Sequence, residues 1–204
     1  MNWSFIICTD GRNNCHFHPY IINSIKKQNI PEYEIIFVVE DDPTNPFDVI
    51  GDKMKTIRVK TFKEAQITLK KNIGAHVAKY ENLCFMHDYL FLSENWYQSF
   101  DIFGYDWNVC TSKIFSGNNR YWDWCVYKHP VLGHTKVDYD MEATKYHYAP
   151  GNFFCVKRRF FLNNLLNPEL CWDEGEDIEW SRRIDEKWNY KINTLSSVHF
   201  LKIK

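Results

Sequence analysis

The chain has 204 residues, 45% of them hydrophobic and 25% charged, and this composition excludes a disordered, fibrous or coiled-coil protein. Its formal net charge of −1 provides no overall positive field, which argues against nucleic acid as a partner. The length fits one domain over residues 1–204. Aromatic residues make up 17% of the chain, and they either fill cores or form stacking surfaces for flat ligands and sugar rings.

The seven cysteines follow no repeated spacing, which indicates reduced, buried thiols rather than disulfides and therefore a reducing compartment such as the cytoplasm. The first residues lack the charged and apolar regions of a signal peptide, and no apolar run approaches the roughly 18 residues of a transmembrane helix. We expect a cytoplasmic domain without a transmembrane segment, which could also be part of a larger protein.

Apolar runs of strand length alternate with helical patterns in the first half, and the predicted strands are residues 5–8, 35–39, 57–59 and 83–86. A helix is expected from Pro19 until Asn29 and Pro31 end it. A second helix is predicted from an apolar stripe at four-residue spacing, which should be buried. The members of this stripe are Ala65, Leu69, Ile73 and Val77. This alternation predicts a mainly parallel sheet with helices on both faces.

The second half of the chain is less regular. Residues 101–148 form an aromatic, glycine-containing stretch that we expect to be a long loop or hairpin. Order returns with a strand predicted over residues 149–156 and a short helix over 159–167. A charged helix is predicted over residues 176–187, followed by a terminal strand over 198–201.

Polar residues directly follow three of the predicted strands, at residues 9–12, 40–41 and 87–88. The carboxyl ends of parallel strands meet at one edge of a sheet, where ligands of such folds gather. We therefore expect these residues to lie together, and this convergence is the first indication of a functional site.

Asp88 ends an apolar run, where one carboxylate can hold Mg²⁺ or Mn²⁺ whose other ligands are diphosphate oxygens. His87 would assist this carboxylate or merely flank it. The pair could equally cap a helix beginning near Ser93, and the sequence alone leaves both interpretations open.

The segment 172–183 carries an acidic cluster at the start of a predicted helix. A stripe at four-residue spacing, Trp180, Ile184 and Trp188, should face the core. Glu176 and Asp177 begin this inward face, so a carboxylate there suits a general base that takes a proton from an acceptor hydroxyl. Trp172 adds a flat face nearby. The alternative is that the acidic residues only cap the helix and complement its dipole.

Three further features have two interpretations each. His199, on the terminal strand, is either a core residue or a metal ligand. The Lys-Lys-Asn run at residues 70–72 either reaches a diphosphate or forms a solvated helix face. The aromatic residues of segment 121–127 either stack on a sugar ring or pack over the sheet. A zinc site is rejected because no Cys-x-x-Cys pair supports it.

Six segments in this order resemble GT-A glycosyltransferases, especially the family-two-like and galactosyltransferase-like branches. They are the first strand and its loop at 4–13, the second strand and its acids at 34–41, an Arg-Asn-x-Gly-like helix at 69–75, the metal-motif position at 85–88, the acceptor-side glycine strand at 149–160, and Gly-Glu-Asp at 175–177. The resemblance implies the GT-A fold, an α/β, Rossmann-like single domain. Its nucleotide-sugar-binding half would lie near residues 1–100 and its acceptor-binding, catalytic half near 101–204.

The resemblance also implies roles for single residues. Asp177 would be the base of an inverting enzyme, Glu176 would contact the acceptor, and Asp88 with His199 would hold Mn²⁺ or Mg²⁺. Further acceptor contacts are expected from Gly151, Asn152 and Trp172. Donor contacts are expected from Thr9, Asp10, Gly11, Arg12, Glu40, Asp41, Lys71, Asn72 and His87. The chain departs from the family at His-Asp-Tyr 87–89, which has one carboxylate where many relatives have two.

The activity implied by the resemblance is transfer of a sugar from a nucleotide-diphosphate sugar, a UDP-sugar being favoured, to a hydroxyl of a glycan or glycoprotein. The incomplete metal motif leaves a second hypothesis open, a nucleotide-sugar- or carbohydrate-binding module of the same fold with little or no turnover. A nucleotidyltransferase is disfavoured because residues 9–12 do not resemble its glycine-rich phosphate loop. A dehydrogenase is disfavoured because no Gly-x-Gly-x-x-Gly follows the first strand.

Overall fold

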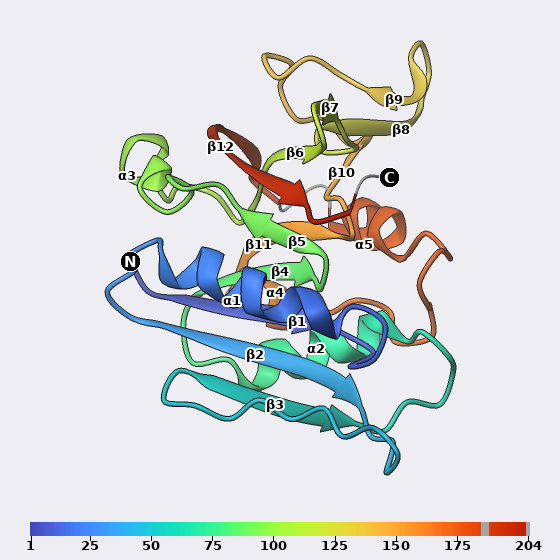
Figure 1. Ribbon diagram of the computed structural model, residues 1–204. Helices are drawn as coiled ribbons and strands as arrows, with labels where there is room; N and C mark the ends of the chain where they lie inside the picture. Colours follow the sequence, from blue (N-terminus) through green and yellow to red (C-terminus); the bar gives the residue numbers. More distant parts are fainter. Residues whose placement is uncertain (185–187, 203–204) are drawn as a thin grey trace.

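The computed structural model describes residues 1–184 and 188–202, and its centre is one mixed sheet. Within the described residues, nine strands join in the order β3-β2-β1-β4-β11-β6-β12-β5, with β7 paired to β6 (Figure 1). The strands of this sheet are β1 (Trp3–Cys8), β2 (Tyr33–Glu40), β3 (Met54–Val59), β4 (Asn82–His87), β5 (Leu90–Leu92), β6 (Val109–Ser116), β7 (Asn119–Arg120), β11 (Phe153–Lys157) and β12 (Tyr190–Phe200).

Strands β3, β2, β1 and β4 run parallel, and their register aligns their carboxyl ends. Cys8, the last residue of β1, lies opposite Val38 of β2 and His87 of β4. The residues that follow these strands therefore meet at one edge of the sheet. β11 runs antiparallel to β4, so its first residue, Phe153, lies opposite Met86 at this same edge. The predicted α/β architecture with a mainly parallel sheet is confirmed.

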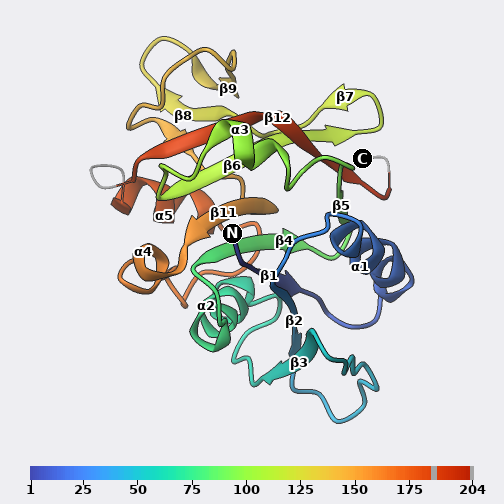
Figure 2. The ribbon, with the colours of Figure 1, turned by 90° about the vertical axis from the view of Figure 1, so that its left-hand side faces the viewer.

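Helices cover both faces of the sheet. They are η1 (Cys15–Phe17), a short 3-10 helix, and α1 (His18–Lys26), α2 (Ile67–Val77), α3 (Ser99–Phe103), α4 (Arg158–Leu162) and α5 (Glu176–Ile184). Successive residues of β1 point to opposite faces, so Ile6 packs in one cluster with Trp180 of α5, and Phe5 packs in another with Ile21 of α1. Figure 2 shows α2, α4 and α5 on one side of the sheet and α1 on the other.

The apolar stripe predicted for helix α2 is only partly confirmed: Leu69 and Ile73 pack, partly buried, against the core, but the two ends of the stripe do not. Ala65 precedes the helix and is exposed, and Val77 at its end is 38% exposed. The buried residues of α2 are instead Thr68, Lys70, Lys71, Asn72, Gly74 and Ala75. One side of the helix lies so close to β1 that a Cβ on Gly74 would be 2.5 Å from Ile6. The segment 166–170 covers another side, where it accepts hydrogen bonds from Thr68 and Asn72, so polar residues of α2 are buried as well.

Residues 101–148 contain strands where a loop or hairpin is expected. Besides β6 and β7, they include β8 (Cys125–His129), β9 (Gly133–Lys136) and β10 (His147–Tyr148). These three strands form a small second sheet in the order β10-β8-β9, and β8 and β9 lie at the top of the view in Figure 1. The chain leaves the main sheet after β7 and returns to it at β11.

The C-terminal elements differ in extent from those predicted. The strand expected over 149–156 begins only at Phe153, and the helix expected over 159–167 is confined to α4. The terminal strand β12 is much longer than 198–201 and has a register shift between Asn193 and Ser197. Helix α5 is described as far as Ile184, and the end of the helix predicted over 176–187 lies outside the described residues.

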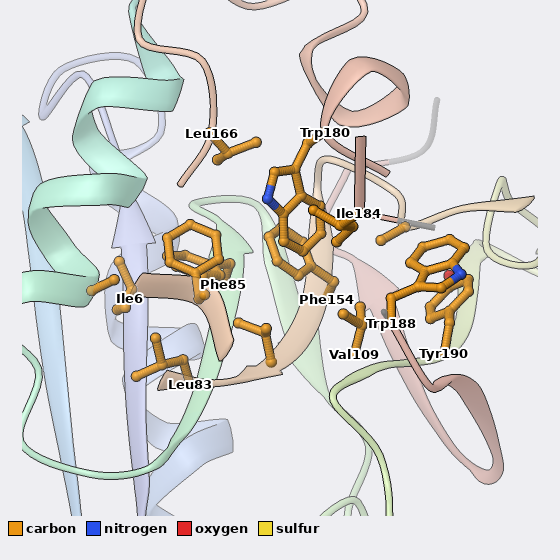
Figure 3. Packing of buried hydrophobic residues seen from close by; sticks show 14 of the residues in the cluster. Ile6, Leu83, Phe85, Val109, Phe154, Leu166, Trp180, Ile184, Trp188 and Tyr190 are labelled. Atoms are coloured by element: carbon orange, nitrogen blue, oxygen red, sulfur yellow. The ribbon is translucent and has the colours of Figure 1, made fainter. Parts of the chain in front are cut away.

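The apolar stripe that begins in α5 is buried as its spacing predicts. Trp180 and Ile184 are each 1% exposed, and Trp188 is 5% exposed. Figure 3 shows Trp180 beside Phe154 of β11 and Trp188 against Tyr190 of β12. This packing fixes the acidic start of α5 relative to β11.

The seven cysteines are free thiols, of which six are buried and Cys15 is exposed, whereas burial is expected for all of them. Within residues 1–184 and 188–202, no helix has both the length and the apolar character needed to cross a bilayer.

Candidate active site

Two adjoining pockets lie at the carboxyl edge of the sheet. The strand-end pocket, about 350 Å³, is lined by Cys8, Thr9, Asp10, Asn14, Glu40, Glu64, Ala65, Ile67, Lys70, His87, Asp88 and Trp172. The α5 pocket, about 390 Å³, is lined by His87, Tyr89, Tyr121, Trp122, His134, Tyr148, Pro150, Gly151, Asn152, Trp172, Asp173, Gly175, Glu176, Asp177 and Ile178. Both volumes suit small ligands. His87 and Trp172 line both pockets, so the two meet at these residues.

Asp88 is a buried carboxylate of the strand-end pocket. Its Oδ2 accepts a hydrogen bond from Thr9 Oγ1 at 2.7 Å, and its Oδ1 accepts one from Asn14 Nδ2 at 2.9 Å. Burial raises the pKa of Asp88 above its ordinary value, and these two hydrogen bonds oppose the rise. Asn14 was not predicted from the sequence, where only its place in the loop after the first strand could have indicated it.

A buried cation lines the same pocket. Lys70 of α2 is 5% exposed, and its Nζ donates to Thr9 O at 3.1 Å and forms an ion pair with Glu40 Oε1 at 3.1 Å. These contacts connect the start of α2 to the ends of β1 and β2. Lys70 is the one lysine or arginine among the described residues that line this pocket, which makes it the natural partner of an anionic ligand.

The loop after β1 is held by its own polar groups. Burial raises the pKa of Asp10, but hydrogen bonds from the backbone N–H groups of Arg12 and Asn13 outweigh this effect and lower it. Gly11 has a φ of +71°, and a Cβ there would lie 2.7 Å from Asn45 Nδ2, so the turn requires glycine. Gly11 therefore shapes the loop that presents Asp10 to the strand-end pocket.

The backbone at Gly151 contacts the acidic start of α5. Gly151 N donates to Asp177 Oδ2 at 2.9 Å, and Gly151 O accepts a hydrogen bond from Lys71 Nζ at 2.7 Å. A Cβ on Gly151 would lie 3.1 Å from Glu176 Oε1 and 3.2 Å from Asp177 Oδ2. Glycine is therefore favoured at this position by the space available, since its φ is not positive.

The two acidic residues differ in their surroundings. Glu176 is 6% exposed, and burial raises its pKa, while the charge of Lys71 lowers it and the charge of Asp177 raises it further. Asp177 is half-buried and lines the α5 pocket. A carboxylate held by a backbone N–H at the edge of a pocket is suited to accept a proton from a bound hydroxyl.

Aromatic residues and a histidine form another wall of the α5 pocket. His134 Nε2 and Tyr148 Oη share a hydrogen bond of 3.1 Å, and the rings of Trp122 and His134 have centroids 4.7 Å apart. Of the aromatic residues of segment 121–127, Tyr121 and Trp122 line the pocket. His134 and Tyr148 were not predicted, because β9 and β10, which bring them to the pocket, lie in the segment expected to be a loop or hairpin.

The structure brings most of the predicted residues to these two pockets. On the donor side, Thr9, Asp10, Glu40 and His87 line the strand-end pocket together with Asp88. The predicted acceptor-side and catalytic residues, Gly151, Asn152, Trp172, Glu176 and Asp177, all line the α5 pocket. Arg12 and Asp41 lie elsewhere: the Arg12 guanidinium binds Asp42 and Thr44, and Asp41 is exposed.

Three other predicted residues have protein partners and do not line the strand-end pocket. The Asn72 amide donates to Leu166 O at 2.9 Å and accepts from Leu166 N at 3.1 Å, so it holds the covering segment 166–170. His199 shares a hydrogen bond of 2.9 Å with Ser197, and its ring stacks with phenylalanines of β5 and β6. Lys71 donates to Gly151 O, in the turn that lines the α5 pocket.

Asp88 is the residue of the strand-end pocket that could hold a divalent ion. Each oxygen of Asp88 accepts one hydrogen bond and keeps a second lone pair, and Mg²⁺ or Mn²⁺ is often bound by one or two carboxylates, phosphate oxygens and water. Among the described residues, no group of three or more His, Cys, Asp or Glu side chains is placed to hold a metal ion. The substrate and water would therefore supply the remaining ligands.

The fold of this chain matches structures of GT-A glycosyltransferases over nearly the whole length of the chain. The match to GalNAc-T7, solved with UDP, GalNAc and Mn²⁺, has a TM-score of 0.70 and 15% identity and covers 98% of this chain and 44% of that chain. A fragment of S. aureus TarS matches with a TM-score of 0.65 and 16% identity, over 98% of this chain and 60% of that chain. The same fragment in complex with UDP-GlcNAc matches with a TM-score of 0.65 and 14% identity, over 100% of this chain and 59% of that chain.

These comparisons establish the fold that the sequence resemblance implies. The chain spans 44% to 60% of the lengths of these three structures. No family model matches the sequence, and no curated protein matches it either.

Proposed function

We propose that this chain is a glycosyltransferase that moves a sugar from a nucleotide-diphosphate sugar to a hydroxyl group of a glycan or glycoprotein. The donor occupies the strand-end pocket and the acceptor occupies the α5 pocket. The observation that carries this proposal is that the two pockets meet at His87 and Trp172, with the carboxylate of Asp88 in one and that of Asp177 in the other. The GT-A fold supports the same assignment.

The strand-end pocket has the chemistry that a nucleotide-sugar requires. Thr9, Asp10 and Glu40 provide hydrogen-bonding groups for the nucleoside, and Lys70 provides positive charge for the diphosphate. Asp88 would hold Mn²⁺ or Mg²⁺, and such an ion, when bound, neutralises the charge that develops on the departing diphosphate. UDP-sugars are the favoured donors, since GalNAc-T7 was solved with UDP and TarS with UDP-GlcNAc.

Asp177 is the proposed catalytic base. Its carboxylate takes the proton of the acceptor hydroxyl as the hydroxyl oxygen forms a bond to the anomeric carbon. The bond between that carbon and the diphosphate oxygen breaks, and its electron pair leaves with the nucleoside diphosphate. Attack from the face opposite the leaving group inverts the anomeric configuration. The hydrogen bond from Gly151 N to Asp177 Oδ2 sets the orientation of the carboxylate before the acceptor arrives.

A second candidate function is a binding module of the same fold that holds a nucleotide-sugar without turnover. The observation that favours it is the single carboxylate at the metal position, both of whose oxygens already accept hydrogen bonds, from Thr9 and Asn14. This candidate predicts donor binding without release of the nucleoside diphosphate.

One experiment separates the two candidates. The purified chain is incubated with UDP-, GDP-, CMP- and dTDP-sugars, with and without Mn²⁺, and both the melting temperature and nucleotide release are measured. A transferase stabilised by one donor releases its nucleotide faster when a glycan acceptor is added. NMR of the product's anomeric proton then gives its configuration, and a retained configuration would exclude Asp177 as the base of a single displacement.

Variants test the two carboxylates separately. Asp88→Asn should abolish stabilisation by donor and Mn²⁺ together, while Asp177→Asn should keep that stabilisation and reduce kcat by about 10²- to 10⁴-fold. The matched control is Glu179→Gln. Glu179 is on the same helix, and its carboxylate pairs with Arg183. If Asp177→Asn transfers sugar as fast as Glu179→Gln does, Asp177 is not the base.

A further inference from the structure

We infer that Lys71 is a positioning residue for the catalytic carboxylate: it fixes the backbone of Gly151, which in turn holds Asp177, and its charge acts on Glu176 rather than on the donor. This inference rests on the proposed function and adds a residue to it. It also reassigns Lys71, which the family resemblance places among the donor contacts.

The first observation is the burial of the Lys71 ammonium. The residue is 1% exposed, its Nζ donates to Gly151 O at 2.7 Å, and Nζ lies 5.6 Å from the ring centroid of Phe154. It forms no ion pair with any residue that the structure describes. Burying an ammonium without an ion-pair partner lowers the free energy of unfolding. We therefore expect a lysine that is buried in this way to have a functional role.

The second observation is the place of Gly151 between the lysine and the acid. Its carbonyl accepts from Lys71 Nζ, and its N–H donates to Asp177 Oδ2 at 2.9 Å. Glu176 Oε1 lies 3.1 Å from the position that a Cβ would take. Because one residue carries both hydrogen bonds, a shift of the Gly151 carbonyl moves the N–H that orients the base.

The third observation is that the turn before β11 has a second anchor outside α2. The backbone N–H of His87 donates to Asn152 O at 3.0 Å. The turn is therefore held by the end of β4 on one side and by Lys71 on the other. With its β4 anchor intact, loss of Lys71 should displace the turn by part of an ångström rather than unfold it.

The fourth observation is the set of charged and titratable groups around the two acids. They come from α2, the loop before α5, the end of β4 and the residues after it, the segment after β7 and the small sheet, and they are Lys71, Asp173, His87, Tyr89, Tyr121, His134 and Tyr148. Lys71 is the one permanent cation in this set. Its charge opposes the rise in the pKa of Glu176 that burial and Asp177 produce. Removing it should raise the pKa of Glu176 further.

Lys70, the preceding residue of α2, has different contacts from Lys71 and lines the other pocket. Its Nζ binds Glu40 and the carbonyl of Thr9, and it lines the strand-end pocket. Lys71, one residue later, contacts the turn that lines the α5 pocket. Consecutive lysines of α2 are thus divided between the two pockets.

The test compares Lys71→Met, which removes the charge at similar length, with Lys71→Arg, which retains it. Lys157→Met is the control, because the Lys157 ammonium also donates to an oxygen and lies over an aromatic ring: its Nζ is 2.7 Å from Asn82 Oδ1 and 4.1 Å from the ring centroid of Trp107. For Lys71→Met we expect kcat for sugar transfer to fall by about 10²-fold, with the KM of the donor changed by less than about threefold. Lys71→Arg, which keeps the charge, should restore part of the lost kcat.

Two results would overturn the inference. If Lys71→Met weakens UDP binding more than about tenfold and leaves kcat unchanged, Lys71 is a donor ligand. If Lys157→Met loses as much kcat as Lys71→Met does, the effect is a general loss of stability.

A second readout needs no activity, so it separates this inference from the proposed function. NMR-detected hydrogen exchange at the Gly151 amide should be faster in Lys71→Met than in Lys157→Met, and ¹³C NMR titration of the Glu176 carboxyl should show a higher midpoint. If the wild-type chain is inactive but Lys71→Met still shows both changes, the result contradicts the proposed function but not the positioning role. Unchanged exchange and an unchanged midpoint contradict the positioning role in an active or an inactive chain.

Discussion

The hydroxyl of Thr9 connects two strand ends that are 79 residues apart in the chain. Thr9 Oγ1 donates to Asp88 Oδ2 at 2.7 Å and accepts from Gly11 N at 2.9 Å. Since the hydroxyl has a single proton, its donation to Asp88 determines that it acts as an acceptor toward Gly11. The orientation of the carboxylate after β4 therefore depends on the turn after β1.

Thr9→Val should weaken donor binding without disturbing the fold. The substitution keeps the shape of the side chain but removes the proton donated to Asp88, and a hydrogen bond to a charged group contributes about 1.5–3 kcal/mol. We expect the Kd of UDP in the presence of Mn²⁺, measured by calorimetry, to rise by about tenfold or more. Thr9→Ser, which retains the hydroxyl, is the control. Equal affinities of the Val and Ser variants would contradict the role of this hydrogen bond.

Gly151→Ala should reduce turnover while leaving donor binding intact. The added Cβ would lie 3.1 Å from Glu176 Oε1 and 3.2 Å from Asp177 Oδ2, so the acids must move by a few tenths of an ångström. We expect kcat to fall by about tenfold to 10²-fold, with the Kd of UDP within about twofold of the wild type. Gly51→Ala is the control, because its Cβ would meet only the flexible side chain of Met54. Full activity of the Gly151 variant would show that the base tolerates displacement.

Trp172→Ala should weaken binding of both substrates with little loss of stability. Trp172 is 56% exposed and lines both pockets, so its ring is available to ligands and contributes little to the core. We expect the KM of donor and of acceptor to rise by about three- to tenfold, with the urea midpoint of unfolding nearly unchanged. Trp180→Ala, at 1% exposure, should instead lower the free energy of unfolding by about 3–5 kcal/mol. A change in the KM of only one substrate would place Trp172 in a single pocket.

The free energy of unfolding should fall as the pH drops from about 6.5 toward about 4, because burial lowers the pKa of His18 to about 4. The native state keeps this histidine neutral over that range, whereas the unfolded chain takes up a proton, so protonation favours unfolding. Near pH 5 the loss is about 2 kcal/mol relative to neutral pH.

His18→Phe tests this linkage. The His18 ring lies against Phe37 and Phe47, and neither ring nitrogen has a hydrogen-bond partner among the described residues. Urea denaturation at about pH 5 and about pH 7.5 should show a smaller difference for His18→Phe than for the wild type. His76→Gln, at an exposed position, should leave the difference unchanged. A wild-type pH dependence retained by His18→Phe would assign it to other groups, such as His147.

The donor side of the site follows from local patterns in the sequence. Short apolar runs predict parallel strands, and parallel strands bring the residues after them to one edge, which places Thr9, Glu40 and Asp88 together. This inference needs no knowledge of long-range contacts, because the order and direction of the strands alone bring these residues together. The acidic start of α5 was predictable for a similar reason, since the buried Trp180 stripe fixes which side of the helix faces inward.

Other parts of the site depend on contacts that no local pattern encodes. The buried polar side of α2 exists because Leu166, 94 residues away, pairs with Asn72. His134 and Tyr148 meet on strands of two to four residues, which are too short to have a clear alternation. His199 lies beyond a register shift in β12, and which side of a strand faces a site changes with every residue of register.

Lys70 and Lys71 give α2 a mechanical role. Neighbouring residues of a helix share one stiff backbone, so Lys70 and Lys71 connect the two pockets through a single turn of α2. If the proposed function holds, a diphosphate that attracts the Lys70 ammonium would act on the turn that carries Lys71 and, through Gly151, on Asp177. On that proposal we expect an ordered reaction in which the donor binds first.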